Sequence, residues 1–342
     1  MNIVISSKRF VPILGGSIQY AVMLARAFRA QGHQVTFVTR TPGKTTEVEG
    51  SQVMRLPGGR ELLELAATAD VLLQVDASWR DVWPFLFYRV PWFPTVHFGY
   101  PEGRISLRQR LELGGLKAAF RIGQPISVGH EVARSWGLRG EVIPNPYDDA
   151  CFFHRPAAAA PRDVEVLFVG RLERSKGIFV LLEALESLAR QSSSPIRAVF
   201  VGDGPDETEL VSRIDPSHPQ LHITLVGRQG PDGVAAWMRR SKVLAFPTTH
   251  GWVEASPLTP LEALACGCHI VASDNGGTRE NIGPQGVLVP MGNSEVLARE
   301  LAGSLTDIQP PDSSAVDAFL ESRLLDKVAA RYLDVFLQAL KS

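Results

Sequence analysis

The sequence predicts an α/β protein with two Rossmann-like domains, each built on a parallel sheet. The chain has 342 residues, which is too long for one ordinary hydrophobic core. Short apolar runs alternate with helical patterns along its length, and this alternation is typical of βαβ units in parallel sheets. The alternation is interrupted once, at the alanine-rich stretch Ala157–Pro161, which we expect to link the two domains.

The first domain is expected over residues 1–152. Its first strand is predicted at Asn2–Ser6, because this short apolar run has no helical spacing. A helix is predicted at Ser17–Gln31, where apolar residues recur at helical spacing until Gly32 ends it. Further apolar runs predict the remaining strands at Gln34–Thr39, Asp70–Val75, Thr95–Phe98, Pro125–Val128 and Glu141–Ile143.

The second domain is expected over residues 153–324, from a second series of short apolar runs separated by helical patterns. Val316–Leu340 is apolar at helical spacing and predicts a closing helix, whose part from about 325 to 342 is expected to pack back on the first domain. Two such domains would bind a shared ligand in the cleft at the carboxyl ends of their strands. The strands are predicted at Val164–Val169, Arg197–Val201, His222–Val226, Lys242–Phe246, His269–Ala272 and Gly286–Val289.

The composition indicates an ordinary globular protein, with 45% apolar and 21% charged residues. Lys and Arg (35) nearly balance Asp and Glu (36), so no overall basic field argues for nucleic acid. Three cysteines form neither a disulfide framework nor a zinc set, and Cys266 and Cys268 are expected as small core residues. The N-terminus lacks a basic region and a long apolar run, so we expect a first strand rather than a signal peptide.

Two glutamates, Glu254 and Glu262, stand eight positions apart with a Ser-Pro and a Thr-Pro between them. Carboxylates accept hydrogen bonds from hydroxyls, so this pair can hold two polyol groups of one ligand. The helix predicted to begin between them offers free backbone N–H groups, which favour an anion such as phosphate. Sugar, ribose and phosphate together outline a sugar nucleotide. The segment equally fits a structural helix start, with Thr259 as N-cap, Pro260 at N1 and Glu262 closing a capping box.

Glycine-containing turns follow the first strand of each half. Gly15-Gly16 would let a ligand approach the backbone closely, with Ser17 capping the helix that follows. In the second half, Gly170–Gly177 contains Arg171 and Lys176, a planar fork and a mobile charge that suit a diphosphate leaving group. The structural alternatives are simple turn geometry for the first turn and a solvated loop with surface cations for the second.

His97 lies in the apolar run Pro94–Phe98, at the expected carboxyl end of a strand. A histidine there could exchange hydrogen bonds with a reacting hydroxyl near neutral pH, although a lone histidine is more often structural. The stretch 79–98 is rich in aromatic residues, which fit a core, a wall beside the acceptor or an interfacial membrane patch. Cations at helical spacing follow it, and they fit either a solvated helix face or the same patch. These cations are Arg104, Arg108, Arg110, Lys117 and Arg121.

With these motifs in order, the chain resembles the retaining glycosyltransferases of family GT4, which have the GT-B fold. The resemblance covers nearly the whole chain and implies two Rossmann-like domains that face each other across a cleft. Its specific part is the pair Glu254 and Glu262, with seven residues between them and Arg171 and Lys176 upstream. The supporting segments are Gly15-Gly16, Ile126–Ala133, Val142–Pro146, Gly202–Pro205 and Asp274–Gly277.

The resemblance implies a role for each matching residue. Arg171 and Lys176 would bind the donor diphosphate. Glu254 would face the hydroxyls of the donor sugar, and Glu262 the nucleotide ribose. His97 matches the family's histidine beside the reacting sugar and completes the implied catalytic set. The other implied donor-binding residues are Gly15, Gly16, Gly227, Arg228, Ala255, Ser256, Leu258 and Thr259.

The chain departs from the family pattern beside the first glutamate. Glu254-Ala-Ser-Pro257 replaces the usual Glu-Gly-Phe-Gly, and Pro257 cannot donate the N–H that a glycine would. The pattern of contacts with the sugar, and therefore the identity of the donor, is left open by this change. Asn145-Pro146 likewise replaces a common Asn-Gly.

The resemblance implies retaining transfer of a sugar from a nucleoside-diphosphate sugar to a hydroxyl acceptor. A UDP-sugar is favoured and a GDP-sugar is open, with polysaccharide, glycolipid or glycosylated metabolite as the product. No Asp-x-Asp motif occurs, so we expect no metal and no other cofactor. A nucleotide-sugar epimerase and a non-catalytic sugar-nucleotide-binding subunit are the alternatives. We expect no nucleic-acid partner, and a cytoplasmic location that allows peripheral contact with the inner face of a membrane.

Overall fold

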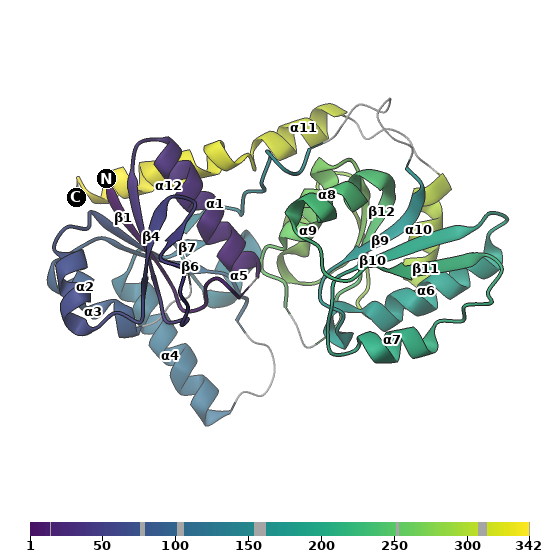
Figure 1. Cartoon of the computed structure of the whole chain (residues 1–342), viewed down its shortest axis with the longest axis horizontal. Helices are drawn as coiled ribbons and strands as arrows, with labels where there is room; N and C mark the ends of the chain where they lie inside the picture. The colour runs from purple at the N-terminus through teal and green to yellow at the C-terminus, as the bar shows by residue number, and fades with distance from the viewer. Residues whose placement is uncertain are drawn as a thin grey trace. The chain divides into compact units, whose positions relative to one another are not determined.

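The computed structural model describes residues 1–13, 15–75, 79–100, 106–153, 162–250, 253–306 and 313–341. The chain forms two compact units, Met1–Pro146 with Arg323–Ser342 and Tyr147–Ser322, each with an α/β architecture (Figure 1). The boundary expected after residue 152 lies a few residues beyond the end of the first segment. The expected linker Ala157–Pro161 lies outside the described residues.

The first unit is built on an eight-stranded sheet with the order β3-β4-β2-β1-β5-β6-β7-β8. All neighbouring strands are parallel except β3 and β4, which are antiparallel. The strands are β1 (Asn2–Ser7), β2 (Gln34–Thr39), β3 (Glu47–Val48), β4 (Ser51–Arg55), β5 (Val71–Gln74), β6 (Trp92–Val96), β7 (Ile126–Ser127) and β8 (Glu141–Val142).

The helices of the first unit complete its core. The last one, α12 (Leu325–Ala339), lies beside α1 (Gly16–Ala30) and buries Tyr332 and Phe336 completely (Figure 1). The Phe336 ring packs 4.8 Å from the ring of Phe93 on β6, so the end of the chain covers the first sheet. The others are α2 (Gly59–Ala66), α3 (Trp83–Phe87), α4 (Leu107–Ile122) and α5 (His130–Trp136), with a 3₁₀ turn η1 (Trp79–Asp81) before α3.

The second unit is built on a six-stranded parallel sheet with the order β11-β10-β9-β12-β13-β14. Its strands are β9 (Val164–Val169), β10 (Ile196–Val201), β11 (Leu221–Leu225), β12 (Ser241–Phe246), β13 (His269–Ser273) and β14 (Val287–Val289). The chain continues outward in opposite directions from the adjacent central strands β9 and β12, so the strand order reverses between them. Such a switch point is where open α/β sheets bind ligands.

Helices cover both faces of this second sheet. The helices of this unit are α6 (Ile178–Gln191), α7 (Glu207–Arg213), α8 (Pro231–Arg240), α9 (Leu258–Ala265), α10 (Ser294–Thr306) and α11 (Ser313–Glu321), and α6, α8, α9 and α10 pack on the strands; the 3₁₀ turns are η2 (Arg174–Lys176) and η3 (Gly276–Glu280). Phe168 and Phe200 from neighbouring strands lie in the core, their ring centroids 5.5 Å apart.

The structure corrects the prediction of one helix over Val316–Leu340. Two helices, α11 and α12, replace it, and the chain is extended at Leu324 (φ −57°, ψ 142°). The non-helical residues between α11 and α12 lie where the chain passes from the second unit to the first. Apolar residues at helical spacing do not indicate such a change of unit. Within the described residues, no helix is long and apolar enough to cross a membrane.

The hairpin of β3 and β4 was not predicted from the sequence. Its turn places Glu49 (φ 47°) and Gly50 (φ 70°) in the left-handed region, as a two-residue hairpin of type I′ requires. Asn-Gly or Asp-Gly is the usual signal for this turn, and Glu-Gly is not. The strand predicted at Thr95–Phe98 is shifted, because the buried pair Trp92 and Phe93 already belongs to β6.

Candidate functional site

The loop that follows β9 is held against the loop that follows β12 at the switch point of the second sheet. Gly177 ends this first loop with φ 75°, and a Cβ atom there would lie 1.8 Å from the Pro247 carbonyl oxygen. Only glycine permits this approach. The N–H of Thr249 also donates to the Ser175 carbonyl at 2.9 Å. The loop that carries Lys176 and the residues that follow β12 are therefore held together by direct backbone contacts.

Glu254 is positioned by the turn at Asn275–Gly277, which follows β13. The N–H of Gly277 donates to the Glu254 carbonyl at 2.7 Å, and the Glu254 N–H donates to Asn275 Oδ1 at 3.4 Å. A Cβ atom on Gly277 would lie 1.8 Å from the carbonyl oxygen of Ala255, so the turn packs directly on this backbone. The paired glycines of this turn belong to the segments that support the family resemblance, and close packing on Glu254 and Ala255 is their structural reason.

Lys176 and Glu254, both predicted site residues, form an ion pair with Nζ and Oε1 2.7 Å apart. Their side chains are only 18% and 10% exposed, so this contact is well shielded from solvent. Arg171, the other predicted cation, points elsewhere: its side chain is 68% exposed and lies 3.2 Å from a Glu173 carboxylate oxygen. In this conformation the two predicted diphosphate ligands are paired with different glutamates.

Glu262 lies on α9 and is 9% exposed. Burial, together with the charge of Asp148, raises the pKa of its carboxyl to about 8. Within the described part of the chain, no side chain or backbone N–H donates a hydrogen bond to this carboxyl group. Burying a carboxyl group without hydrogen-bond donors costs folding free energy, unless a bound ligand supplies the donors.

The capping box expected at this helix is wrong. Helix α9 begins at Leu258 with Pro257 as its N-cap, and no side chain caps it. Thr259 and Pro260 therefore lie inside the first turn. The first N–H groups of a helix have no partner within it, so Leu258 and Thr259 each offer one, while Pro260 has none to offer. Glu262 therefore does not cap this helix, although the sequence allowed that role.

The segment before α9 is fixed by a buried amide that the sequence analysis missed. Asn281 is completely buried, and its Nδ2 donates to Ser256 Oγ and to the Pro257 carbonyl, each at 2.9 Å. These bonds hold the stretch in which the chain departs from the Glu-Gly-Phe-Gly pattern. Nothing in the linear sequence ties Asn281 to Ser256, because they meet only through the packing of η3 beside α9.

Gly227 and Arg228 follow β11 in the same unit. Gly227 (φ 66°) accepts a hydrogen bond at its carbonyl from the Gly202 N–H, at 3.0 Å. Gly202 in turn lies against Gly170, since a Cβ atom there would be 1.9 Å from the Gly170 oxygen. Arg228 is exposed. The turns after β9, β10 and β11 are therefore in contact, which brings Gly227 to the same edge of the sheet as Gly170.

His97 follows β6 in the first unit and is partly buried. Its Nε2 lies 3.0 Å from Thr95 Oγ1, whose single hydrogen is shared toward the carbonyls of Gln74 and Val75. With the Thr95 hydrogen on either carbonyl, Nε2 carries the ring proton and Nδ1 is an acceptor; the other tautomer needs that hydrogen directed at Nε2. Burial lowers the pKa of His97 to about 4, so the ring is neutral at pH 7. The neutral ring can donate or accept a hydrogen bond, but with this pKa it does not titrate near neutrality.

Gly15 and Gly16 also belong to the first unit, after β1. Ser17 does not cap α1 as expected: the helix begins at Gly16, Gly15 is the N-cap, and no side chain bonds to the cap. Both glycines are exposed, and a Cβ atom on Gly15 would meet nothing within 4 Å. The turn is open, as a backbone site for a ligand requires, and its N–H groups stay uncapped.

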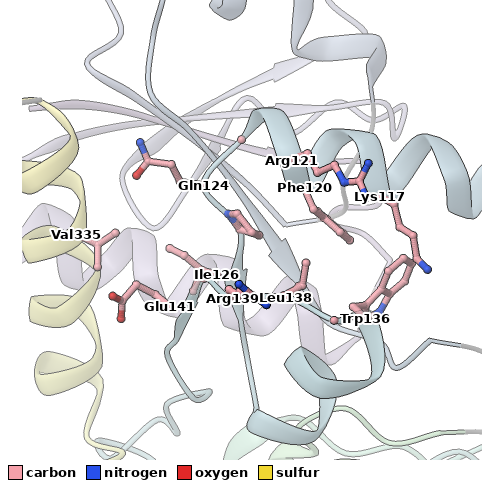
Figure 2. A pocket seen from close by; sticks show the side chains of 14 residues that line it. Lys117, Phe120, Arg121, Gln124, Ile126, Trp136, Leu138, Arg139, Glu141 and Val335 are labelled. Atoms are coloured by element: carbon pink, nitrogen blue, oxygen red, sulfur yellow. The ribbon is translucent and has the colours of Figure 1, made fainter.

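A cavity of about 650 Å³ lies in the first unit, and none of its lining residues is a predicted site residue (Figure 2). It is lined by the residues that precede β7 and β8, by the end of α4 and by Val335 of α12. The cavity thus opens at the amino ends of these strands, opposite the carboxyl ends where His97 lies. It is not the ligand site that the strand pattern predicted.

Comparisons with known proteins agree on one family. The sequence model described as glycosyl transferases group 1 matches residues 152–313. The D-inositol 3-phosphate glycosyltransferase of Jonesia denitrificans is 30% identical over 87% of this chain and 85% of its own. WcaL of Salmonella typhimurium, named for colanic acid biosynthesis, is 31% identical over 44% of this chain, and the match spans 38% of WcaL.

Two solved structures have the same fold. Anabaena Alr3699/HepE in complex with UDP has a TM-score of 0.80 at 17% identity, with 99% of this chain and 100% of that chain covered. Sucrose-phosphate synthase from Thermosynechococcus elongatus has a TM-score of 0.75 at 20% identity, covering 98% of each chain. The expected GT-B fold, with two Rossmann-like parallel-sheet domains, is confirmed.

Proposed function

The chain belongs to the group 1 glycosyltransferases, and from this premise we propose that it moves a sugar from a nucleoside-diphosphate sugar to a hydroxyl acceptor with retention of configuration. The buried carboxyl of Glu262 is the observation that supports this proposal best. It lies in the first turns of α9, is 9% exposed and lacks a hydrogen-bond donor among the described residues. The two adjacent hydroxyls of a ribose supply the donors that such a group needs.

The second unit holds the other groups that a donor requires. The N–H groups of Leu258 and Thr259 at the start of α9 suit the phosphates. Lys176 supplies the cation for the departing diphosphate, while Glu254, its partner at 2.7 Å, accepts from sugar hydroxyls once the donor separates the pair. Arg171 reaches the same diphosphate by turning its exposed side chain away from Glu173.

The reaction breaks the bond between the anomeric carbon and the diphosphate oxygen, and forms one from the acceptor oxygen to the same face of that carbon. The acceptor proton passes to the departing phosphate oxygen, so no enzymic nucleophile is needed. His97, neutral at pH 7, orients a hydroxyl of the reacting sugar. Lys176 and the helix start stabilise the developing negative charge, and we propose that they do so without a metal.

A UDP-sugar is the proposed donor. The HepE structure, which has the same fold, was solved with UDP, and the relatives are named for colanic acid biosynthesis and for transfer to D-inositol 3-phosphate. These names favour a glycan or glycoconjugate product and a polar hydroxyl acceptor. We propose a cytoplasmic location, because nucleotide sugars are made there.

The test is hydrolysis and transfer with UDP-, GDP- and ADP-sugars, comparing the wild type with Lys176→Ala and Glu262→Ala. Each variant should lose most transfer, since removing one preorganised charge-stabilising group costs on the order of a hundredfold in rate. Lys327→Ala and Glu183→Ala, exposed residues outside the site, are the matched controls. Donor binding that is unchanged in both site variants would refute the assignment.

Two further outcomes would replace the reaction itself. A new sugar nucleotide formed without any acceptor would identify an epimerase. Donor binding that depends on Glu262, with neither hydrolysis nor transfer for any donor and acceptor, would identify a non-catalytic binding subunit.

A further inference from the structure

Exposed apolar side chains are concentrated in one region of the first unit. More than half of the large apolar residues that the structure shows as exposed lie between positions 79 and 122. Phe87 is 73% exposed, and Leu107 and Leu111 are 74% and 70% exposed. Such residues scattered singly need no explanation, but their concentration marks a surface that binds something.

The helix α4 has a second apolar face in addition to its buried one. Leu113, Ala119 and Phe120 face the core. A stripe on the outside recurs at helical spacing along the whole helix, and each of its members is exposed. The stripe consists of Leu107, Leu111, Gly114, Ala118 and Ile122.

A row of cations runs along one flank of this stripe. Arg110, Lys117 and Arg121 recur at i, i+7 and i+11, so they lie on one face of α4, and all three are exposed. The one acid of the helix, Glu112, is paired with Arg108 at 3.0 Å. The flank is therefore strongly positive, although the whole chain is almost neutral.

Exposed aromatic side chains also lie on the segment of η1 and α3. Trp83, Phe87 and Tyr88 are 49%, 73% and 46% exposed. This segment is attached to α4, because Trp79 Nε1 donates to the Gly115 carbonyl at 3.0 Å. In Figure 1, α4 projects at the lower end of the first unit, and α3 lies at its lower left beside α2.

The cavity of Figure 2 continues the positive flank. Lys117 and Arg121 lie on its wall together with Arg139, and Glu141 is the one acid in its lining. Its apolar lining includes Phe120 and Trp136. At about 650 Å³ the cavity has room for a phosphate-bearing head group beside the helix.

We propose that α3 and α4 form an interfacial surface that binds an anionic lipid bilayer. The exposed stripe and the aromatic side chains enter the boundary between head groups and acyl chains, and the cations of α4 bind lipid phosphates. Aromatic rings, leucines and a flanking basic row are the composition that a bilayer interface selects.

A second copy of the chain is a poorer partner for this surface. A twofold contact would bring the basic rows of both copies close together, and few acids lie beside them: Glu112 is already paired with Arg108, and Glu141 lies in the cavity. A bilayer of anionic lipid supplies negative charge beside apolar chains, which matches both parts of the surface.

Vesicle co-sedimentation at low salt tests the proposal, with phosphatidylglycerol/phosphatidylcholine vesicles against pure phosphatidylcholine. The wild type should partition strongly to the anionic vesicles alone. Each cation near such a surface is worth about fivefold in partition, so Arg110→Glu/Arg121→Glu should lower binding by at least about 25-fold. Arg190→Glu/Lys327→Glu makes the same change in net charge elsewhere and should leave binding unchanged.

A second pair of variants tests the apolar stripe. Leu107→Ser/Leu111→Ser should lower partition, while Val211→Ser, an exposed position in the second unit, should not. Hydrolysis of a soluble donor should be unchanged in every variant, which shows that each is folded and separates this proposal from the proposed reaction. Wild-type binding to neither vesicle, or equal losses in the controls, would overturn the proposal. The proposal would also be overturned if light scattering showed a wild-type dimer that becomes a monomer in Leu107→Ser/Leu111→Ser.

Discussion

Replacing Glu262 with glutamine removes a titratable group and keeps its shape, so it isolates the energetic effect of one buried carboxyl. The group is 9% exposed and has no hydrogen-bond donor among the described residues. Burial favours the neutral form, and the charge of Asp148 adds to this effect. We expect Glu262 to be protonated at neutral pH when no ligand is bound.

The sign and size of the effect follow from the two pKa values. The folded pKa is raised to about 8 from an ordinary 4.5, so the folded state binds the proton more tightly than the unfolded state. This stabilisation is complete below pH 4.5 and disappears as the pH rises to 8. At 1.36 kcal/mol per pKa unit, the loss is on the order of 5 kcal/mol. Glu262→Gln lacks this dependence.

Urea unfolding between pH 4.5 and 8 measures the difference in unfolding free energy between the wild type and Glu262→Gln. If the two units unfold in separate transitions, the relevant one is the transition that added UDP shifts, because UDP stabilises the unit that binds it. The wild type should lose stability relative to Glu262→Gln as the pH rises, and Asp148→Asn should lose less than the wild type. Parallel curves for the wild type and Glu262→Gln would refute the reasoning. Titration calorimetry gives a second check: if ribose hydroxyls donate to an ionised Glu262, UDP binding at pH 7 releases a proton.

Further predictions follow from other contacts. Glu254→Gln frees Lys176 from its ion pair, so calorimetry should show UDP bound several-fold more tightly while sugar transfer falls; unchanged UDP affinity would contradict this. Gly277→Ala places a methyl group 1.8 Å from the Ala255 oxygen, and should raise the donor KM at least tenfold or abolish expression of folded protein. Asn281→Leu leaves the Pro257 carbonyl without its donor and should raise the donor KM about tenfold, whereas Asn281→Gln should partly restore it. Dialysis against EDTA should leave transfer intact, and an activity restored only by added Mg²⁺ would disprove metal independence.

Much of the site could be located from the sequence because its residues follow strands. Lys176 and Glu254 follow β9 and β12, and the order of a parallel sheet brings such loops to one switch point. Alternating apolar runs were enough to find these strands. Helix starts were harder, since Thr259-Pro260 has the right composition for a cap and the chain begins the helix two residues earlier.

The parts that could not be predicted depend on contacts distant in sequence. Asn281 fixes Pro257 across the packing of two elements, and no local pattern marks an asparagine for this task. The ion pair of Lys176 with Glu254 joins two groups that the family pattern assigns separately to the donor. The division of the last helical segment reflects the path of the chain between two units, which helical spacing does not encode.

The place of α12 has a consequence for the synthesis of the protein. The first sheet is translated early, but the rings of Tyr332 and Phe336 that complete its core come after all of residues 147–322. A ribosome therefore finishes the entire second unit while the first still exposes Phe28 and Phe93. During that interval the first unit is the one exposed to chaperones and proteases, although it was made first.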